Sequence, residues 1–188
     1  MRVNVTPDQI QAAFDAVKAE GAFEESRGLW ERGRPPTEMI QALCLRPEIL
    51  RGFGAFGHGL YPDGLLERRI KELVIIAASE ANDCQFCRDS HCHLVEITDI
   101  IPEPQRVIHE REAIAPRERL AIDYTRAAMA NSNAIPDTLM GELREQFTDP
   151  ELVELTLLIG YINMLNLFNN CLQVRYHGEY SLLGAGAP

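Results

Sequence analysis

Residues 72–91 read ELVIIAASEANDCQFCRDSH, and this stretch decides how the rest of the chain is interpreted. Its first part contains the aliphatic run Leu73–Ala78, which has no polar side. A helix that is apolar all round belongs at the centre of a helical bundle. Its second part contains Asn82 and Asp83, either of which is a suitable N-cap for a new helix. The stretch therefore predicts a central helix, a tight turn, and a second helix that carries a CxxC pair.

The second helix places three reactive side chains on one face. Cys84, Cys87 and His91 are spaced i, i+3 and i+7, and side chains at these intervals lie above one another. Two thiols at this spacing close a small disulfide, and a thiol needs a base nearby to become a nucleophilic thiolate. Unpaired backbone N–H groups and the helix dipole at the helix start also favour a thiolate. The pattern predicts a redox site in which His91 is the base toward Cys87.

Glu72 is the candidate partner of His91. It precedes aliphatic residues that we expect to be buried, and a partly buried carboxylate there can hold and orient a histidine. The alternative is an ordinary ion pair with Arg68 or Arg69, which lie at i−4 and i−3 on the same helix.

A zinc site is the alternative interpretation of the two cysteines. Zinc usually takes four ligands, often as two paired knuckles, but the sequence has no second CxxC, and Cys44 and Cys171 stand alone. His91 would be the third ligand and Glu72 or His93 the fourth, although His93 falls on the helix face opposite the dithiol. We therefore favour redox chemistry over metal binding.

The rest of the chain is also helical in pattern. No segment alternates with period two for long enough to form a strand, so the sequence predicts an all-α fold. Thr6–Gln9 is an N-cap followed by proline, which opens a helix to about Glu20. Residues 21–34 are interpreted as a loop or a short helical turn. Further helices are expected over residues 35–45, 48–60, 65–80, 83–97, 116–131, 136–147 and 149–176.

Composition limits the possible partners. The chain of 188 residues has a net charge of −10, which argues against nucleic acid or an anionic membrane surface as a partner. The longest apolar run, residues 155–168, contains Asn163 and Asn166 and is too short to span a bilayer. The first residues lack the apolar segment of a signal peptide. We expect a cytoplasmic protein, in which a CxxC is more often catalytic or metal-binding than structural.

Glu72, followed by Cys84-x-x-Cys87 and then His91, resembles the active-site signature of the carboxymuconolactone decarboxylase family, in its alkylhydroperoxidase D-like branch. The flanking segments at residues 46–50, 66–76 and 163–166 agree with this resemblance, which covers roughly residues 38–175. The resemblance implies an all-α bundle of about seven to nine helices in one domain. Residues 1–37 would be an N-terminal helical extension, residues 38–176 the core, and residues 177–188 a loose tail.

The resemblance also implies an activity. Members of this branch act as thiol-dependent peroxidases or disulfide reductases, or they reduce a partner peroxiredoxin, with a dihydrolipoyl group or another dithiol as the electron source. No bound cofactor or metal is expected. Cys87 would attack the peroxide and become a sulfenic acid, Cys84 would resolve it to a disulfide, and Glu72 and His91 would relay the proton. The family also implies a homo-oligomer, either a dimer, a trimer or a hexamer.

Two positions depart from the family pattern. Phe86 stands where well-studied members have a second histidine, and Leu167 follows Asn166 where relatives often have arginine. The physics of the helix start favours Cys84 as the more readily ionised thiol, so an alternative division of labour gives Cys84 the exchange with the external dithiol.

Two other functions stay open at this point. One is lactone decarboxylation, although the decarboxylases of the family lack the cysteine pair. The other is a non-catalytic helical protein that is stabilised by zinc or senses redox state.

The last helix carries four asparagines in an otherwise apolar pattern. We expect them to be hydrogen-bonded groups in the core or at a subunit interface, because buried amides need partners; contact with the substrate is the alternative. The aliphatic faces of this helix also exceed what one small domain needs, which predicts an oligomer interface. The four residues are Asn163, Asn166, Asn169 and Asn170.

Overall fold

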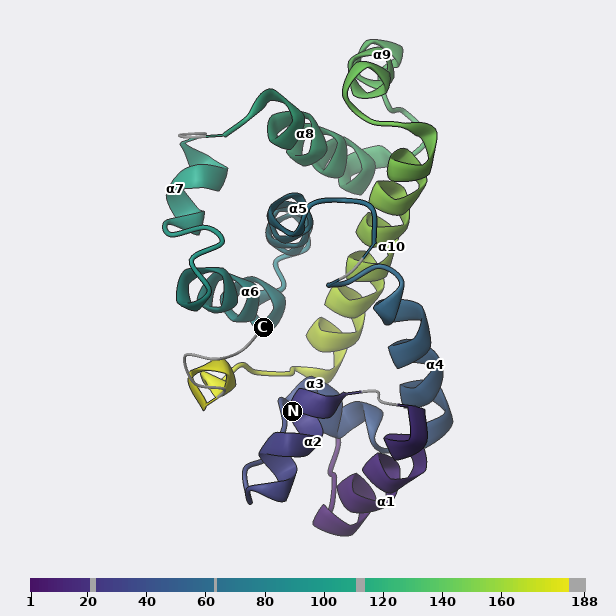
Figure 1. The fold of residues 1–188 in the computed structure, drawn as a ribbon, viewed down its shortest axis with the longest axis vertical. Coiled ribbons are helices and arrows are strands. Elements are labelled where there is room, and N and C mark those ends of the chain that lie inside the picture. The colour runs from purple at the N-terminus through teal and green to yellow at the C-terminus, as the bar shows by residue number, and fades with distance from the viewer. Residues whose placement is uncertain (21–22, 63, 111–113, 183–188) are drawn as a thin grey trace.

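The computed structural model describes residues 1–20, 23–62, 64–110 and 114–182, and these residues are helical with no strand (Figure 1). The all-α prediction is confirmed. The described residues form ten α-helices and two 3₁₀ helices, slightly more than the sequence predicts. The α-helices are α1 Pro7–Val17, α2 Glu24–Glu31, α3 Glu38–Leu43, α4 Pro47–His58, α5 Arg68–Ala81, α6 Gln85–Ile97, α7 Pro104–His109, α8 Pro116–Asn131, α9 Asp137–Gln146 and α10 Asp149–Leu172. The 3₁₀ helices are η1 Lys18–Glu20 and η2 Glu179–Leu182.

The extra helices lie where the sequence pattern is weak. α2 occupies most of residues 21–34, which are interpreted as a loop or a short helical turn, and α7 lies between two prolines, where the mixed sequence predicts no element. η2 lies within residues 177–188, the predicted loose tail, and packs against α6. The sequence does not predict η2, because a single turn of helix is too short to show a periodic pattern.

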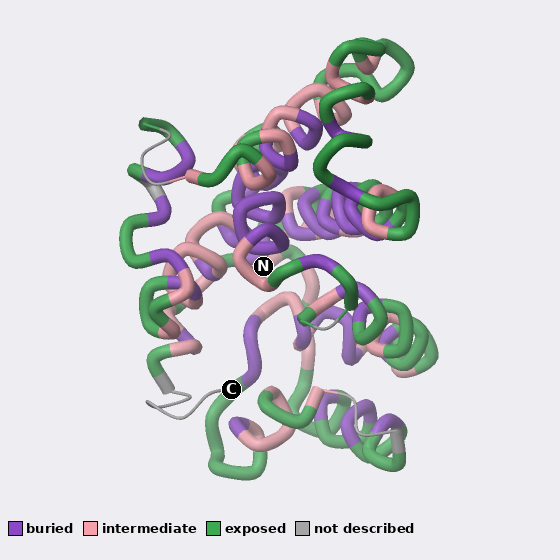
Figure 2. Tube along the Cα trace, turned by 45° about the horizontal axis from the view of Figure 1, so that its top comes forward, coloured by how far each residue is buried: buried purple, intermediate pink, exposed green. Residues whose placement is uncertain are grey.

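α5 is the central helix, as its apolar sequence predicts. Ten consecutive residues, Ile70–Ser79, are buried. Figure 1 shows α5 nearly end-on between α6, α8 and α10, and these three helices make its main contacts. Buried residues concentrate along α5 and on the inner faces of its neighbours, while the outer faces are exposed (Figure 2).

α10 runs along the length of the molecule and connects its two ends (Figure 1). It begins with a capping box between Thr148 and Glu151 and ends at Gln173, which has a left-handed backbone. By length and composition this helix would be able to cross a membrane. It instead packs against α5, α6 and α8, and it buries polar residues among them, as a core helix does. One side of α10 faces the end of the molecule formed by α1 to α4.

The N-terminal helices share one hydrophobic cluster. Phe14 and Val17 of α1 pack with Leu43 of α3 and Leu50 of α4. Cys44 lies in the same cluster, and burial raises the pKa of its thiol to about 11. This cysteine is therefore a core residue of the N-terminal cluster.

A buried ion pair anchors the loop between α4 and α5. Lys71 is fully buried, and its Nζ lies 2.6 Å from Oε1 of Glu154 and donates to the Leu60 carbonyl at 2.7 Å. The Glu154 carboxylate accepts from the backbone N–H groups of Leu65 at 2.6 Å and Leu66 at 3.1 Å. Burial would raise the pKa of Glu154, but these contacts lower it overall. The pair fixes the path of the loop that carries Tyr61.

Candidate active site

The turn between α5 and α6 positions the first cysteine. Asp83 has a left-handed backbone with φ of 50°, and Cys84 is extended and occupies the N-cap position of α6. The expectation that Asn82 or Asp83 would cap this helix is therefore wrong. The Asn82 side chain instead donates to Asn163 at 2.8 Å and to Asn166 at 3.1 Å on α10. Because α10 binds the Asn82 side chain, Cys84 occupies the N-cap position of α6.

The two cysteines are a reduced, buried pair. Cys84 is 1% exposed and Cys87 is 4% exposed, and both are free thiols. The Cys87 thiol and the Cys87 backbone N–H both donate to the Cys84 sulfur. These donors lower the pKa of Cys84 to about 7. The hydrogen bond to Cys84, followed by burial, raises the pKa of Cys87. The geometry therefore stabilises the negative charge on Cys84, at the helix N-terminus, while Cys87 keeps its proton.

Amide groups of α10 lie against both sulfurs. Asn169 Nδ2 donates to Cys87 Sγ at 3.2 Å, and the Asn166 amide acts to lower the pKa of both thiols. Asn166 Nδ2 also donates to Ser79 Oγ at 3.2 Å. Hydrogen bonds of these α10 asparagines were expected from the sequence. Their contact with the dithiol was not, because 82 residues separate Cys87 from Asn169.

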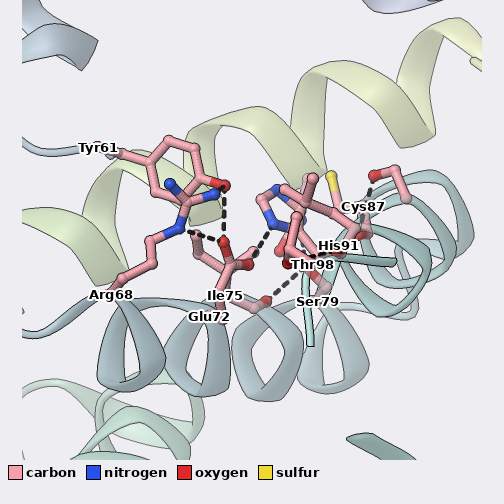
Figure 3. Close-up of polar contacts among 11 residues, drawn as sticks. Tyr61, Arg68, Glu72, Ile75, Ser79, Cys87, His91 and Thr98 are labelled. Atoms are coloured by element: carbon pink, nitrogen blue, oxygen red, sulfur yellow. Dashed lines mark hydrogen bonds and ion pairs between the residues drawn. The ribbon is translucent and has the colours of Figure 1, made fainter. Parts of the chain in front are cut away.

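Glu72 is held by three side chains (Figure 3). Its Oε2 lies 2.7 Å from His91 Nδ1, and its Oε1 accepts from Tyr61 at 2.7 Å and from Arg68 Nε at 2.6 Å. Arg68 also donates to the Tyr61 hydroxyl, and its guanidinium lies 4.2 Å from the centre of the Tyr61 ring. Burial alone would raise the pKa of this fully buried carboxyl, but its contacts with His91, Arg68 and Tyr61 lower it.

The two roles that the sequence suggests for Glu72, a partner of His91 and an ion pair within its own helix, thus occur together. It pairs with Arg68 and also holds His91, while Arg69 turns away to Glu118 at 2.8 Å. Because an ionised carboxylate is only an acceptor, the neutral His91 ring carries its proton on Nδ1. Its Nε2 is then left as the basic nitrogen. Figure 3 shows the ring on the side of Glu72 nearer to Cys87.

A cavity of about 680 Å³ opens beside this group. Cys87, His91 and Tyr61 line one part of it, whereas Cys84 does not line it. The remaining wall comes from residues of α2 to α6, α10 and η2 and is mainly aromatic and aliphatic. It includes Phe23, Phe53, Phe86, Ile75, Tyr161, Leu165 and Tyr180.

Other predicted positions lie as follows. His93 faces away from the dithiol, as expected, and bonds through Nδ1 to the Tyr176 hydroxyl at 2.5 Å. Phe86, which stands in place of a second histidine, packs edge-on against Tyr176 and forms part of the cavity wall. No group of three or more metal-ligating side chains occurs in the described part of the chain. The set considered for zinc therefore does not come together among the described residues, since no three of its side chains form such a group.

Tyr61 is a site residue that the sequence does not reveal. It lies in a proline-containing turn, 11 residues before the carboxylate that it contacts. Its ring also packs edge-on against His91, with centroids 5.7 Å apart. Burial and the charge of Glu72 raise its pKa well above the usual value, so Tyr61 is a hydrogen-bond donor rather than a base.

Comparisons with known proteins agree with the resemblance found in the sequence. Residues 47–95 match the model of the carboxymuconolactone decarboxylase family. The uncharacterized protein YnjA of Escherichia coli strain K12 is 29% identical over 173 residues, which cover 78% of this chain and 94% of YnjA.

Two solved structures share the fold. An uncharacterized peroxidase-related protein of Ralstonia eutropha JMP134, described as an alkylhydroperoxidase AhpD core, superposes with a TM-score of 0.71 at 22% identity, over 98% of this chain and 93% of that chain. A protein of unknown function from Agrobacterium tumefaciens superposes with a TM-score of 0.63 at 27% identity, over 74% of this chain and 97% of that chain.

Proposed function

We propose that this chain, which matches the carboxymuconolactone decarboxylase family model over residues 47–95 and has the alkylhydroperoxidase-like fold, is a thiol-dependent peroxidase. Its substrate would be an organic hydroperoxide, and Cys84 and Cys87 would supply the electrons. The observation that carries this proposal is the position of Cys87 and His91 on one apolar cavity, with the Cys84 thiolate directly behind.

The first step is attack of Cys87 on the distal peroxide oxygen. The Cys87 proton passes to His91, the O–O bond breaks, and His91 returns the proton to the departing alkoxide. Cys87 becomes a sulfenic acid and the substrate an alcohol. Glu72 supports this exchange because it holds Nδ1–H of His91 at 2.7 Å and keeps Nε2 basic.

The second step closes the disulfide. The Cys84 thiolate attacks the Cys87 sulfur, the S–O bond breaks, and the departing hydroxide takes up the proton that Cys84 had released. The hydroperoxide and two thiols thus become alcohol, water and a disulfide. The lowered pKa of Cys84, about 7, suits this resolving role. The division of labour implied by the family resemblance is therefore the one that we propose.

An external dithiol must reduce this disulfide. Both sulfurs are buried, so the reductant has to reach them along the cavity that also admits the hydroperoxide. A slender dithiol, such as a dihydrolipoyl group on a flexible arm, fits this route better than a broad protein surface. The cavity volume of about 680 Å³ and its aromatic wall also favour an organic hydroperoxide over hydrogen peroxide.

The experiment is hydroperoxide consumption with dihydrolipoamide or dithiothreitol. Cys87→Ser should abolish turnover, and His91→Ala should lower the rate by about 10²-fold or more, the usual contribution of general acid–base catalysis. His93→Ala and Cys171→Ser are matched controls outside the site and should retain the wild-type rate. Equal rates in all five proteins would remove the site assignment. Turnover of a carboxylated lactone by a protein lacking both cysteines would instead favour decarboxylation.

We also propose that two copies associate through α10. Four exposed apolar side chains lie along one of its faces: Val153, Leu157, Met164 and Leu167, which are 59%, 47%, 49% and 66% exposed. Their positions are nearly symmetric about Gly160. The space beside Gly160 is open, with no neighbouring atom where a side chain would begin. Two antiparallel copies of this helix would therefore match apolar residues to apolar residues, as a two-fold interface requires.

A further inference from the structure

Asn169 stands out among the buried polar residues of α10. It is 1% exposed, and its Nδ2 donates to Cys87 Sγ at 3.2 Å and to Met39 Sδ at 3.6 Å. Both acceptors are sulfur atoms, which accept hydrogen bonds weakly. Its Oδ1 is buried, and no donor in the described part of the chain bonds to it.

Asn166, one turn earlier on the same helix, shows what a satisfied amide looks like here. Its Oδ1 accepts from Asn82 at 3.1 Å and its Nδ2 donates to Ser79 Oγ at 3.2 Å. Asn169 has no such oxygen partners. A buried amide with an unbonded oxygen destabilises a fold, and a leucine of similar size would fill the same space without that loss. Residues of this kind are expected where function requires them.

The position of Asn169 indicates that its function concerns the Cys87 sulfur. Its amide touches the sulfur that, in the proposed function, attacks the hydroperoxide. That sulfur passes through two forms with opposite needs. The thiolate accepts hydrogen bonds, whereas the sulfenic acid carries a hydroxyl group that donates one. A primary amide meets both needs, because it offers an N–H donor and a carbonyl acceptor on one side chain.

We propose that Asn169 is a catalytic residue that serves both forms of Cys87. Its Nδ2 stabilises the sulfur as the proton leaves for His91, and its Oδ1 accepts the hydroxyl of the sulfenic acid formed by O–O cleavage. The sulfenic acid is thereby held until the Cys84 thiolate attacks its sulfur and expels hydroxide. This inference rests on the proposed function, and it adds a residue that neither the CxxC motif nor the Glu72–His91 pair contains.

The test uses Asn169→Leu in a Cys84→Ser background, in which the sulfenic acid on Cys87 cannot be resolved. The rate of sulfenic acid formation, followed by trapping with dimedone and mass spectrometry, should fall about tenfold or more relative to Cys84→Ser alone. This factor is what a hydrogen bond to a charged group contributes. In the otherwise wild-type chain, Asn169→Leu should melt at the same temperature as wild type or higher, because it removes an unbonded buried oxygen.

Asn170→Leu is the matched control. Asn170 donates to the Asn82 carbonyl at 2.9 Å and does not touch the sulfurs. This variant should melt at a lower temperature and form sulfenic acid at the parent rate, the reverse of the pattern for Asn169→Leu. If Asn169→Leu folds poorly, Asn169→Asp keeps the shape and the acceptor but loses the donor, and it should also slow sulfenic acid formation.

A second readout separates this inference from the proposed function. Ultraviolet absorbance titrates the Cys87 thiolate without any peroxide, and Asn169→Leu should raise the Cys87 pKa relative to the Cys84→Ser parent. If the parent forms no sulfenic acid, the proposed function fails, and the titration alone then decides whether the amide acts on this sulfur. An unchanged Cys87 pKa, or an unchanged rate of sulfenic acid formation in a reactive parent, would overturn the role of Asn169.

Discussion

The ionisation of Cys84 is the property of the site that is most directly open to measurement. Its pKa of about 7, against an ordinary value of 9.0, reflects mainly the hydrogen bond donated by the Cys87 thiol. Replacing Cys87 with alanine removes that donor and keeps the backbone N–H. We therefore expect the Cys84 pKa to rise by part of the difference between these values, which corresponds to about 3 kcal/mol in total. Cys87→Ser retains a hydroxyl donor, so the Cys84 pKa should rise less in this variant than in Cys87→Ala.

The assay is ultraviolet absorbance of the thiolate as a function of pH. The matching Cys84→Ser variants supply the background from the other three cysteines. Wild type should titrate near 7, Cys87→Ser at a somewhat higher pH, and Cys87→Ala higher still. A wild-type Cys84 that titrates near 9, or an alanine variant that still titrates near 7, would refute the hydrogen-bond explanation.

The same pKa difference makes the stability of the reduced protein depend on pH. Folding lowers the Cys84 pKa, so the folded state releases this proton before the unfolded state does. The resulting stabilisation is fully present only above the unfolded pKa of 9.0 and is lost as the pH falls through about 7. Above 9, the raised pKa of Cys87 acts in the opposite direction. Denaturant unfolding of reduced protein should therefore show stability rising from pH 7 to pH 9, and this rise should be absent in Cys84→Ser.

Three further predictions concern other parts of the molecule. Glu72→Gln should lower peroxide turnover by about 10²-fold in steady-state assays, because the amide no longer fixes the protonated nitrogen of His91; a wild-type rate would show that this carboxylate only pairs with its arginine. Lys71→Met should destabilise the fold by about 3–5 kcal/mol in denaturant unfolding, because it leaves the charge of Glu154 without its lysine. The double variant with Glu154→Gln, which keeps an acceptor for the N–H groups of Leu65 and Leu66, should recover much of that loss, and no recovery would contradict the pairing. Leu157→Glu combined with Leu167→Glu should reduce the mass of the particle in light scattering to that of one chain, and an unchanged mass would place any interface elsewhere.

Local sequence signals were sufficient to predict the framework of the site. The unbroken aliphatic run of α5 marks a buried helix, and the i, i+3, i+7 spacing on α6 brings sulfurs and imidazole to one face. The link between Glu72 and His91 is one of two interpretations that the residues leave open, and the family resemblance favours it. Periodicity does not predict it, because the two residues lie on different helices.

The parts that could not be predicted depend on tertiary contacts. The Asn82 side chain would cap α6 by local rules, but two asparagines of α10 engage it, and the capping position passes to Cys84. Tyr61 and Asn169 reach the site from a turn and from the last helix, and no pattern in sequence marks such distant partners. The burial of Lys71 could not be predicted for the same reason, since a lysine just before an aliphatic run is normally interpreted as exposed.

The most direct test of the account is the mass of the peptide that contains Cys84 and Cys87 after one equivalent of an organic hydroperoxide. The account predicts that this peptide loses two hydrogens, through a Cys84–Cys87 disulfide, and that Cys44, Cys92 and Cys171 stay reduced. A peptide that remains fully reduced while the other cysteines oxidise would contradict the claim that this dithiol is the reactive centre.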